Sequence, residues 1–173
     1  MILAKADSQR IPHKNIRPFM GKAALLYSIE AAQEAGLRVV VSTDSGGIAR
    51  LAEDAGAEAF KRSDASCKGP MVDALNEVLA VHKCDTVAML YACAPLVTGD
   101  LVNEGVVLFE WTSYDVVTVV DSQKRPAGMY YITSPGFASK GTLAAPNTGY
   151  LTRDAVDIDT IEDWKRTEAL WTN

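Results

Sequence analysis

Short apolar segments alternate with longer stretches of helical periodicity along the chain, and this alternation restricts the fold more than any other feature. In the clearest apolar segment, 38–43, three consecutive valines precede a serine and a threonine. Such an unbroken β-branched run is typical of a strand that is buried on both faces. Strands of this kind that alternate with helices predict a three-layer α/β/α domain with a mainly parallel sheet.

Capping residues divide the chain into elements. Gly36 and Gly56 stand where helix C-terminal caps belong, and Thr98 and Thr160 suit the N-terminal caps of two further helices. The expected strands are 2–4, 38–43, 57–60, 86–91 and 116–120. The expected helices are 22–35, a segment from Asp44 or Ser45 to Gly56, 70–82, 98–111 and a last one after Thr160. Between 121 and 150 we expect one or two short strands, one of them at 129–132.

Length and composition exclude several classes of protein. A chain of 173 residues corresponds to one domain, 1–173. Apolar residues make up 48% and charged residues 23%, which excludes disordered and low-complexity chains. The absence of a long apolar run argues against a membrane span, and the net charge of −5 argues against nucleic-acid binding. Three cysteines without a CxxC pair, and an N-terminus unlike a signal peptide, predict a cytoplasmic location.

The loop after the first strand concentrates groups that can bind phosphate. Ligands of parallel sheets bind at the loops that follow the strands. The loop AKADSQRIPHKN carries basic groups and neutral hydrogen-bonding groups, namely Lys5, Arg10, His13 and Lys14, with Ser8, Gln9 and Asn15. Such a loop can hold a phosphate chain with backbone N–H groups and cations. The alternative interpretation is a solvated surface loop.

Two carboxylates precede the last helix in the segment AVDIDTIEDW. If this segment is extended, Asp157 and Asp159 project to one side and Ile158 to the other. Such a pair suits a hard cation such as Mg²⁺, which prefers oxygen ligands and retains water. Alternatively, one aspartate caps the helix and the other is solvated.

The segment LYACAPL ends another strand in a turn of small residues. Small side chains before Pro95 would let a flat ligand approach the backbone, although a tight strand-to-helix turn explains them equally well. We interpret Cys93 as a packing residue and not as a nucleophile, because no histidine signal accompanies it.

Together and in this order, the segments resemble the cytidylyltransferases that activate nonulosonic, or sialic-type, acids. AKADSQRIPHKNIRPFMGK resembles the family's ARGGSKRIPRKN loop and its P-F-x-G-K turn. VVVSTD, LYACAPL and GMYY resemble further blocks, and DIDTIEDW matches the closing DIDTxEDW. The similarity runs from about residue 2 to 171, and it is greatest to the pseudaminic acid cytidylyltransferases.

The resemblance implies a Rossmann-like, glycosyltransferase-A-like nucleotidyltransferase. Such an enzyme transfers CMP from CTP to a sugar acid and releases pyrophosphate. Asp157 and Asp159 would hold Mg²⁺, and Arg62 with Asn15 would face the cytidine. The other implied catalytic residues are Ser8, Gln9, Arg10 and Lys14. The other implied nucleotide-binding residues are Ala4, Lys5, Ala6, Asp7, Ala94 and Pro95.

The chain also departs from the family pattern. Lys5, Ala6, Asp7 and Gln9 replace the family's Arg, Gly, Gly and Lys. At ~8 Å, an anion beside a triphosphate costs about 2 kcal/mol. Only 121–127 remains where the family carries a dimerisation arm, which predicts a monomer or a different dimer. Two alternatives follow: a nucleotide- or sugar-binding protein without catalysis, and a nucleotidyltransferase with another nucleotide or acceptor.

Overall fold

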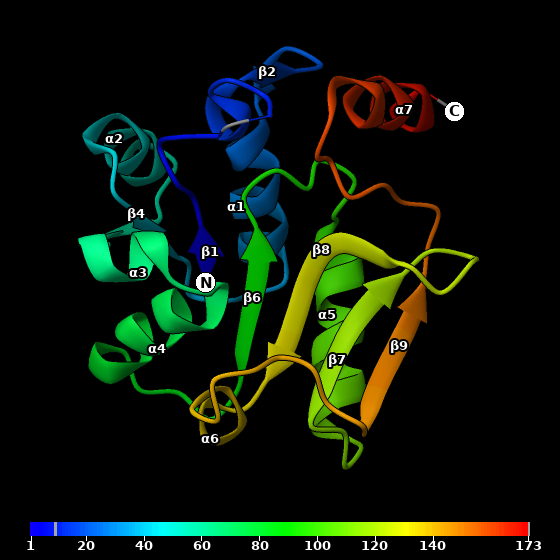
Figure 1. Cartoon of the computed structure of the whole chain (residues 1–173). Helices are drawn as coiled ribbons and strands as arrows, with labels where there is room; N and C mark the ends of the chain where they lie inside the picture. Colours follow the sequence, from blue (N-terminus) through cyan, green and yellow to red (C-terminus); the bar gives the residue numbers. More distant parts are fainter. Residues whose placement is uncertain (9, 173) are drawn as a thin grey trace.

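A seven-stranded sheet forms the centre of the computed structural model, which describes residues 1–8 and 10–172 (Figure 1). Its order is β5-β4-β1-β6-β8-β7-β9. The bounds are β1 Ile2–Leu3, β4 Val40–Thr43, β5 Glu58–Lys61, β6 Val87–Tyr91, β7 Val116–Val120, β8 Pro126–Thr133 and β9 Thr148–Thr152. All neighbouring pairs are parallel except those of β8, which runs antiparallel to β6 and β7. The predicted mainly parallel sheet is therefore confirmed.

Helices cover the sheet on both faces, as predicted. The helices are η1 Lys14–Ile16, α1 Ala24–Glu34, α2 Gly46–Asp54, α3 Asp64–Lys68, α4 Met71–Val81, α5 Gly99–Glu110, α6 Pro135–Ala138 and α7 Ile161–Trp171. Side chains of α1, α2 and α5 enter one core cluster, and side chains of α4 and α6 enter a second. No described helix is both long and apolar enough to cross a membrane.

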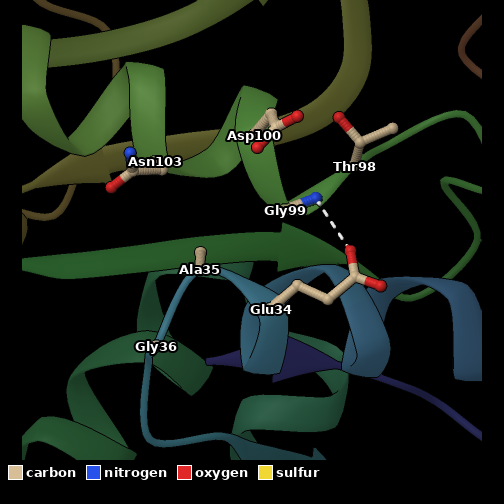
Figure 2. Close-up of a pocket in the computed structure, with 7 residues that line it drawn as sticks. All are labelled: Glu34, Ala35, Gly36, Thr98, Gly99, Asp100 and Asn103. Carbon is tan, nitrogen blue, oxygen red and sulfur yellow. Dashed lines mark hydrogen bonds between the residues drawn. The ribbon is translucent and has the colours of Figure 1, made fainter.

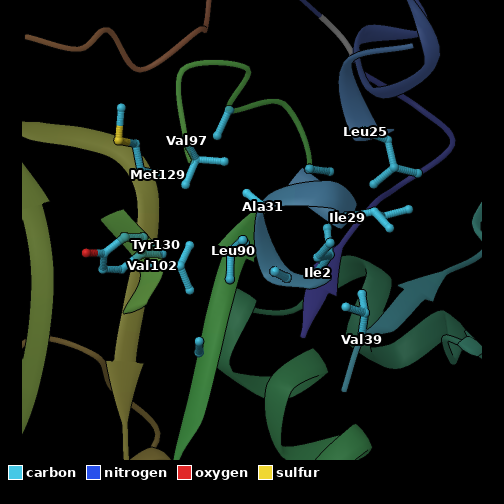
Figure 3. Packing of buried hydrophobic residues seen from close by; sticks show 14 of the residues in the cluster. Ile2, Leu25, Ile29, Ala31, Val39, Leu90, Val97, Val102, Met129 and Tyr130 are labelled. Atoms are coloured by element: carbon cyan, nitrogen blue, oxygen red, sulfur yellow. The ribbon is translucent and has the colours of Figure 1, made fainter. Parts of the chain in front are cut away.

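The main core lies between the sheet and helices α1 and α5 (Figure 3). Ile2 and Leu90 project from neighbouring parallel strands and are fully buried with Leu25 and Ile29 of α1. Tyr130 of β8 is also fully buried, and its hydroxyl donates to the Leu101 carbonyl at 2.9 Å. This core fixes the strand ends that carry the functional loops.

A third, smaller cluster attaches α7 to the rest of the molecule. The short antiparallel hairpin of β2 (Pro18–Phe19) and β3 (Lys22–Ala23) brings Phe19 against the two tryptophans of α7. The ring centroids of Phe19 lie 5.5 Å from Trp164 and 5.7 Å from Trp171. In Figure 1, α7 accordingly stands beside this hairpin, apart from the sheet.

Several expected elements differ in detail. The segment 5–21 was expected to be a loop, but it contains η1 and β2. Helix α3 was not predicted. These elements span only two to five residues, so they are too short to show periodicity. Strand β8 extends well beyond the expected 129–132. Ser45, and not Asp44, caps α2.

Candidate active site

A cavity of about 260 Å³ opens at the carboxyl ends of β1, β5 and β6. Its walls come from the first loop, from the segment that joins β5 to α4, and from the turn after β6. The lining residues are Leu3, Lys5, Asp7, Ser8, Lys14, Asn15, Arg62, Ser66, Gly69, Met71, Tyr91, Ala92 and Cys93. This is the edge of a parallel sheet at which ligands bind.

Two of the hydrogen bonds that hold the first loop do not use its cationic groups. The Ala6 N–H donates to Asp44 Oδ1 at 2.7 Å, and the Asn15 side chain donates to the Lys5 carbonyl at 2.9 Å. His13 adopts a left-handed conformation with φ of 55° at the start of η1. The loop is thus folded back, and Lys5 and Lys14 line the cavity.

Arg62 places an incompletely bonded cation in the cavity wall. It is only 5% exposed, and its Nε donates to Ser42 Oγ at 3.2 Å. Its Nη2 is buried and finds no hydrogen-bond partner among the described residues. Burial lowers the pKa of the guanidinium, and nearby Cys67 and Asp44 oppose that shift. A buried donor without a partner is costly, so a ligand oxygen that accepts from Nη2 would gain affinity.

The two aspartates do not line this cavity: Asp159 is linked to it through Lys14, and Asp157 lines a separate depression of about 180 Å³. Asp159 accepts from Arg10 Nη2 at 2.7 Å and lies 3.6 Å from Lys14 Nζ. Burial raises the pKa of the Asp157 carboxyl, and the charge of Asp159 raises it further. Ile158 between them is 1% exposed and packs in the third cluster.

The last helix is capped by residues outside the pair. The Thr160 side chain accepts from the Asp163 N–H, and the Asp163 carboxylate accepts from the Thr160 N–H. The alternative in which Asp157 or Asp159 caps α7 is therefore wrong.

The carboxylate oxygens of Asp157 and Asp159 suit a divalent metal whose remaining ligands come from a substrate. Two carboxylates lie in mutual electrostatic range: burial raises the pKa of Asp157 most, Asp159 raises it further, and Lys14 and Arg10 oppose the shift. Within residues 1–8 and 10–172, no group of three or more His, Cys, Asp or Glu side chains is arranged to hold a metal. Phosphate oxygens and water would therefore complete the coordination of Mg²⁺, as is usual for this ion.

The structure brings most of the predicted residues together. Lys5, Asp7, Ser8, Lys14, Asn15 and Arg62 line the cavity. Arg10 reaches the site through Asp159, and Gln9 lies outside the described residues. In contrast, Ala4, Ala94 and Pro95 are buried and do not line the cavity, while Ala6 is exposed in the loop that Asp44 holds.

The sequence analysis missed one wall of the cavity. Ser66, Gly69 and Met71 come from α3 and the start of α4. The Gly69-Pro70 pair downstream of Arg62 was the only signal of a turn there. Tyr91, which also lines the cavity, belongs to the LYACAPL segment but was not predicted as a site residue. Cys93 packs in the third cluster, and burial raises its pKa to about 12, which agrees with its interpretation as a packing residue.

A larger depression of about 580 Å³ lies elsewhere, between the end of α1 and the start of α5 (Figure 2). Glu34 closes one side, and its carboxylate accepts from the Gly99 N–H at 3.3 Å. Asp100 and Asn103 line the opposite side. None of the residues predicted to bind nucleotide or metal lies in it.

The topology defines an α/β protein with a mainly parallel sheet and a cavity at the carboxyl ends of its strands. More particularly, the sequence pattern of the family described as Cytidylyltransferase matches residues 1–124, and the chain belongs to this family. The resemblance seen in the sequence motifs is confirmed at this level.

Two relatives show how far the similarity extends. A pseudaminic acid cytidylyltransferase of Campylobacter jejuni is 37% identical over 114 residues, which cover 60% of this chain and 49% of that protein. A CMP-N,N'-diacetyllegionaminic acid synthase of Legionella pneumophila is 29% identical over 153 residues, which cover 83% and 66%. The chain spans about half the length of the Campylobacter protein.

Solved structures share the fold across the whole chain. A CMP:2-keto-3-deoxy-manno-octonic acid synthetase complexed with CTP has a TM-score of 0.78 at 16% identity, and the match covers 99% of this chain and 96% of that one. A Mycobacterium tuberculosis protein in complex with manganese has a TM-score of 0.66 at 16% identity, with coverage of 97% and 96%. At these identities the likeness establishes the fold alone.

Proposed function

We propose that this protein transfers CMP from CTP to a nonulosonic sugar acid and releases pyrophosphate. The observation that carries the proposal is the buried Arg62 Nη2, which has no partner among the described residues, in a cavity that also collects Lys5, Ser8 and Lys14. Membership of the cytidylyltransferase family and the names of the relatives support CTP and a sugar acid as the substrates.

The lining divides the cavity into two chemical parts. Lys5, Ser8 and Lys14 supply cations and a hydroxyl suited to the triphosphate. Arg62 and Asn15 supply donors suited to the cytidine. Asp7 also lines the cavity, so its charge opposes the triphosphate unless a cation accompanies the nucleotide.

Asp157 and Asp159 would hold Mg²⁺ at the edge of the cavity, and the manganese complex of the Mycobacterium protein supports a divalent ion of this kind. When bound, the ion supplies charge neutralisation on phosphate oxygens during the transfer. Lys14 holds the segment in place, because its Nζ donates to the Ile158 carbonyl at 2.6 Å. Arg10 balances the charge of Asp159 until the ion enters.

The reaction itself needs positioning more than covalent chemistry. The anomeric hydroxyl oxygen of the acceptor bonds to the α-phosphorus as the bond to the departing pyrophosphate breaks, and the hydroxyl proton passes to water. Cations that bind the phosphate oxygens more strongly as charge develops lower the barrier. Because both substrates are metabolites of the cytoplasm, we also place the protein there.

Thermal unfolding with each of the four common nucleoside triphosphates, with and without Mg²⁺, tests the nucleotide part. A ligand at 100 times its dissociation constant stabilises by ~2.7 kcal/mol. For this size that corresponds to a melting temperature about 5–10 °C higher. We expect the shift with CTP, and we expect Mg²⁺ to enlarge it. A larger shift with another triphosphate would contradict the proposal.

Pyrophosphate release then tests the acceptor. Pseudaminic acid, N,N'-diacetyllegionaminic acid and 3-deoxy-manno-octulosonate, which the relatives' names suggest, should be offered with CTP and Mg²⁺. Release that needs one of these acids supports the proposal. Release at the same rate without any acid would indicate hydrolysis of CTP instead.

One observation favours a second candidate function, a protein that binds the nucleotide without turnover. Asp159 already carries an ion pair with Arg10 at 2.7 Å, and Lys14 lies close by, so a metal ion must displace or share these contacts. Stabilisation by CTP that is independent of Mg²⁺, without release of pyrophosphate with any of the three acids, would support this candidate.

A further inference from the structure

Gly128 lies in an irregular part of β8 that faces the proposed metal site. Between the pairs Thr118↔Tyr131 and Val120↔Pro126, β7 advances by two residues and β8 by five. The extra residues of β8 form a bulge, and Gly128 within it has a φ of +62°. Bulges re-aim the chain and are frequent next to active sites.

The backbone of Gly128 occupies the space directly against Asp157. An ideal Cβ at position 128 would lie 2.5 Å from Asp157 Cγ and 2.7 Å from Asp157 Cβ, and it would also contact Oδ1. Rotation of the carboxylate cannot relieve a contact with its own Cβ, because the backbone fixes that atom. Any side chain at 128 must therefore displace the backbone, either at Asp157 or in the bulge itself.

The residues that follow Asp157 have little freedom to yield. On one side, Ile158 is 1% exposed in the third cluster, and its carbonyl accepts from Lys14. On the other side, Thr160 is fixed by the capping box of α7. A displacement is consequently taken up by Asp157 and changes its spacing from Asp159.

We infer that Gly128 is a positioning residue of the metal site: the absence of a side chain in the β8 bulge sets the place of the Asp157 carboxylate. This inference rests on the proposed function, in which Asp157 and Asp159 hold Mg²⁺. It assigns to the β8 bulge a part in catalysis without contact to either substrate.

In thermal unfolding with CTP, we measure the Mg²⁺ concentration that gives half of the Mg²⁺-dependent stabilisation. Gly128→Ala should raise this concentration about 10–100-fold, the usual effect of losing support for a metal ligand. Stabilisation by CTP in EDTA should stay unchanged. In turnover, kcat at fixed Mg²⁺ should fall and recover partly at high Mg²⁺. Gly141→Ala is the matched control, because Gly141 has a φ of +79° and nothing within 4 Å of its ideal Cβ.

The outcomes separate this inference from the proposed function. If the wild type shows no Mg²⁺-dependent stabilisation, the metal site itself fails, and the inference fails with it. If the wild type shows it and Gly128→Ala has the same half-saturating Mg²⁺ as Gly141→Ala, the inference alone is overturned.

A stability cycle covers the case in which Gly128→Ala folds poorly. Asp157→Gly removes the three atoms that a Cβ at 128 would meet. Urea unfolding should therefore show that Gly128→Ala destabilises the wild type more than it destabilises the Asp157→Gly variant. Equal destabilisation in both backgrounds would show that Asp157 is not the side chain that position 128 controls.

Discussion

At the scale of single residues, Asp157 illustrates the conflict between stability and function. Its pKa is higher in the folded chain than in the unfolded chain, because burial and Asp159 disfavour the ionised carboxylate. The ionised form therefore destabilises the fold above that pKa, and the penalty disappears as the pH falls through it. Asp157→Asn should raise the melting temperature of the ligand-free protein at pH 8, by about 2–4 °C per kcal/mol gained.

Melting curves between pH 4 and pH 8 check this prediction. The advantage of Asp157→Asn should shrink as the pH falls, while Mg²⁺-dependent stabilisation by CTP should be lost at every pH. Asp159→Asn is the matched control, because it removes the partner of Arg10 and should not raise stability. An advantage for Asp157→Asn that grows in acid would contradict the argument.

Arg62 gives the second prediction at this scale. Arg62→Met keeps the length of the side chain but removes a buried charge and the Nη2 that has no partner among the described residues. We expect the stability of the ligand-free protein to change by less than about 1 kcal/mol, because relief of the buried charge offsets the lost bond to Ser42 and the lost attraction of Cys67 and Asp44. Stabilisation by CTP should fall sharply in thermal unfolding. Unchanged stabilisation would remove Arg62 from the proposed nucleotide site.

Residue types indicated which side chains gather at the cavity better than they indicated its full set of walls. The spacing predicted that Ile158 projects away from the two aspartates, and Ile158 is 1% exposed in the third cluster. Nothing in the spacing indicated that Arg10 and Lys14 approach Asp159, because that contact joins the two ends of the chain. The functional roles of these residues stay predictions.

At the scale of elements, Trp164 is the more deeply buried of the two tryptophans that attach α7. Trp164 is 4% exposed, packs on Phe19 and lies under Arg17, whose guanidinium is 5.3 Å from the ring centroid. Trp164→Ala should cost about 3–5 kcal/mol. Because α7 follows the Asp157–Asp159 segment directly, the variant should also lose Mg²⁺-dependent stabilisation by CTP.

Urea unfolding of Trp164→Ala beside Trp111→Ala checks this prediction. Trp111 ends α5 and is 85% exposed, so its removal should change stability by less than about 0.5 kcal/mol. Similar losses in both variants would show that α7 does not depend on the third cluster.

The elements themselves were predicted where periodicity or a cap marks them. The strand at 116–120 and the cap at Thr160 are confirmed as expected. The direction of β8 could not be read from the chain, because alternation along a strand is the same in either direction. That reversal, together with the bulge, brings Gly128 to Asp157, so the structure was needed to connect the two.

At the scale of the whole molecule, the separate clusters predict an uneven distribution of stability. The main core packs β1, β6 and β8 against α1 and α5. Of the three clusters, only the third includes residues of α7. Regions with few buried apolar contacts open at lower free energy than the global unfolding. Native-state hydrogen exchange should therefore show the amides of α7 opening before those of β6 and β7.

The same experiment links this uneven stability to the proposed site. If Asp157 and Asp159 hold an ion that also contacts the nucleotide, the site joins α7 to the first loop and β6. CTP with Mg²⁺ should then slow exchange in α7 more than in α4, whose packing on the second cluster does not involve the aspartates. The reverse pattern, with greater protection of α4, would mean that the ligand stabilises the cavity wall at Met71 and leaves α7 uncoupled.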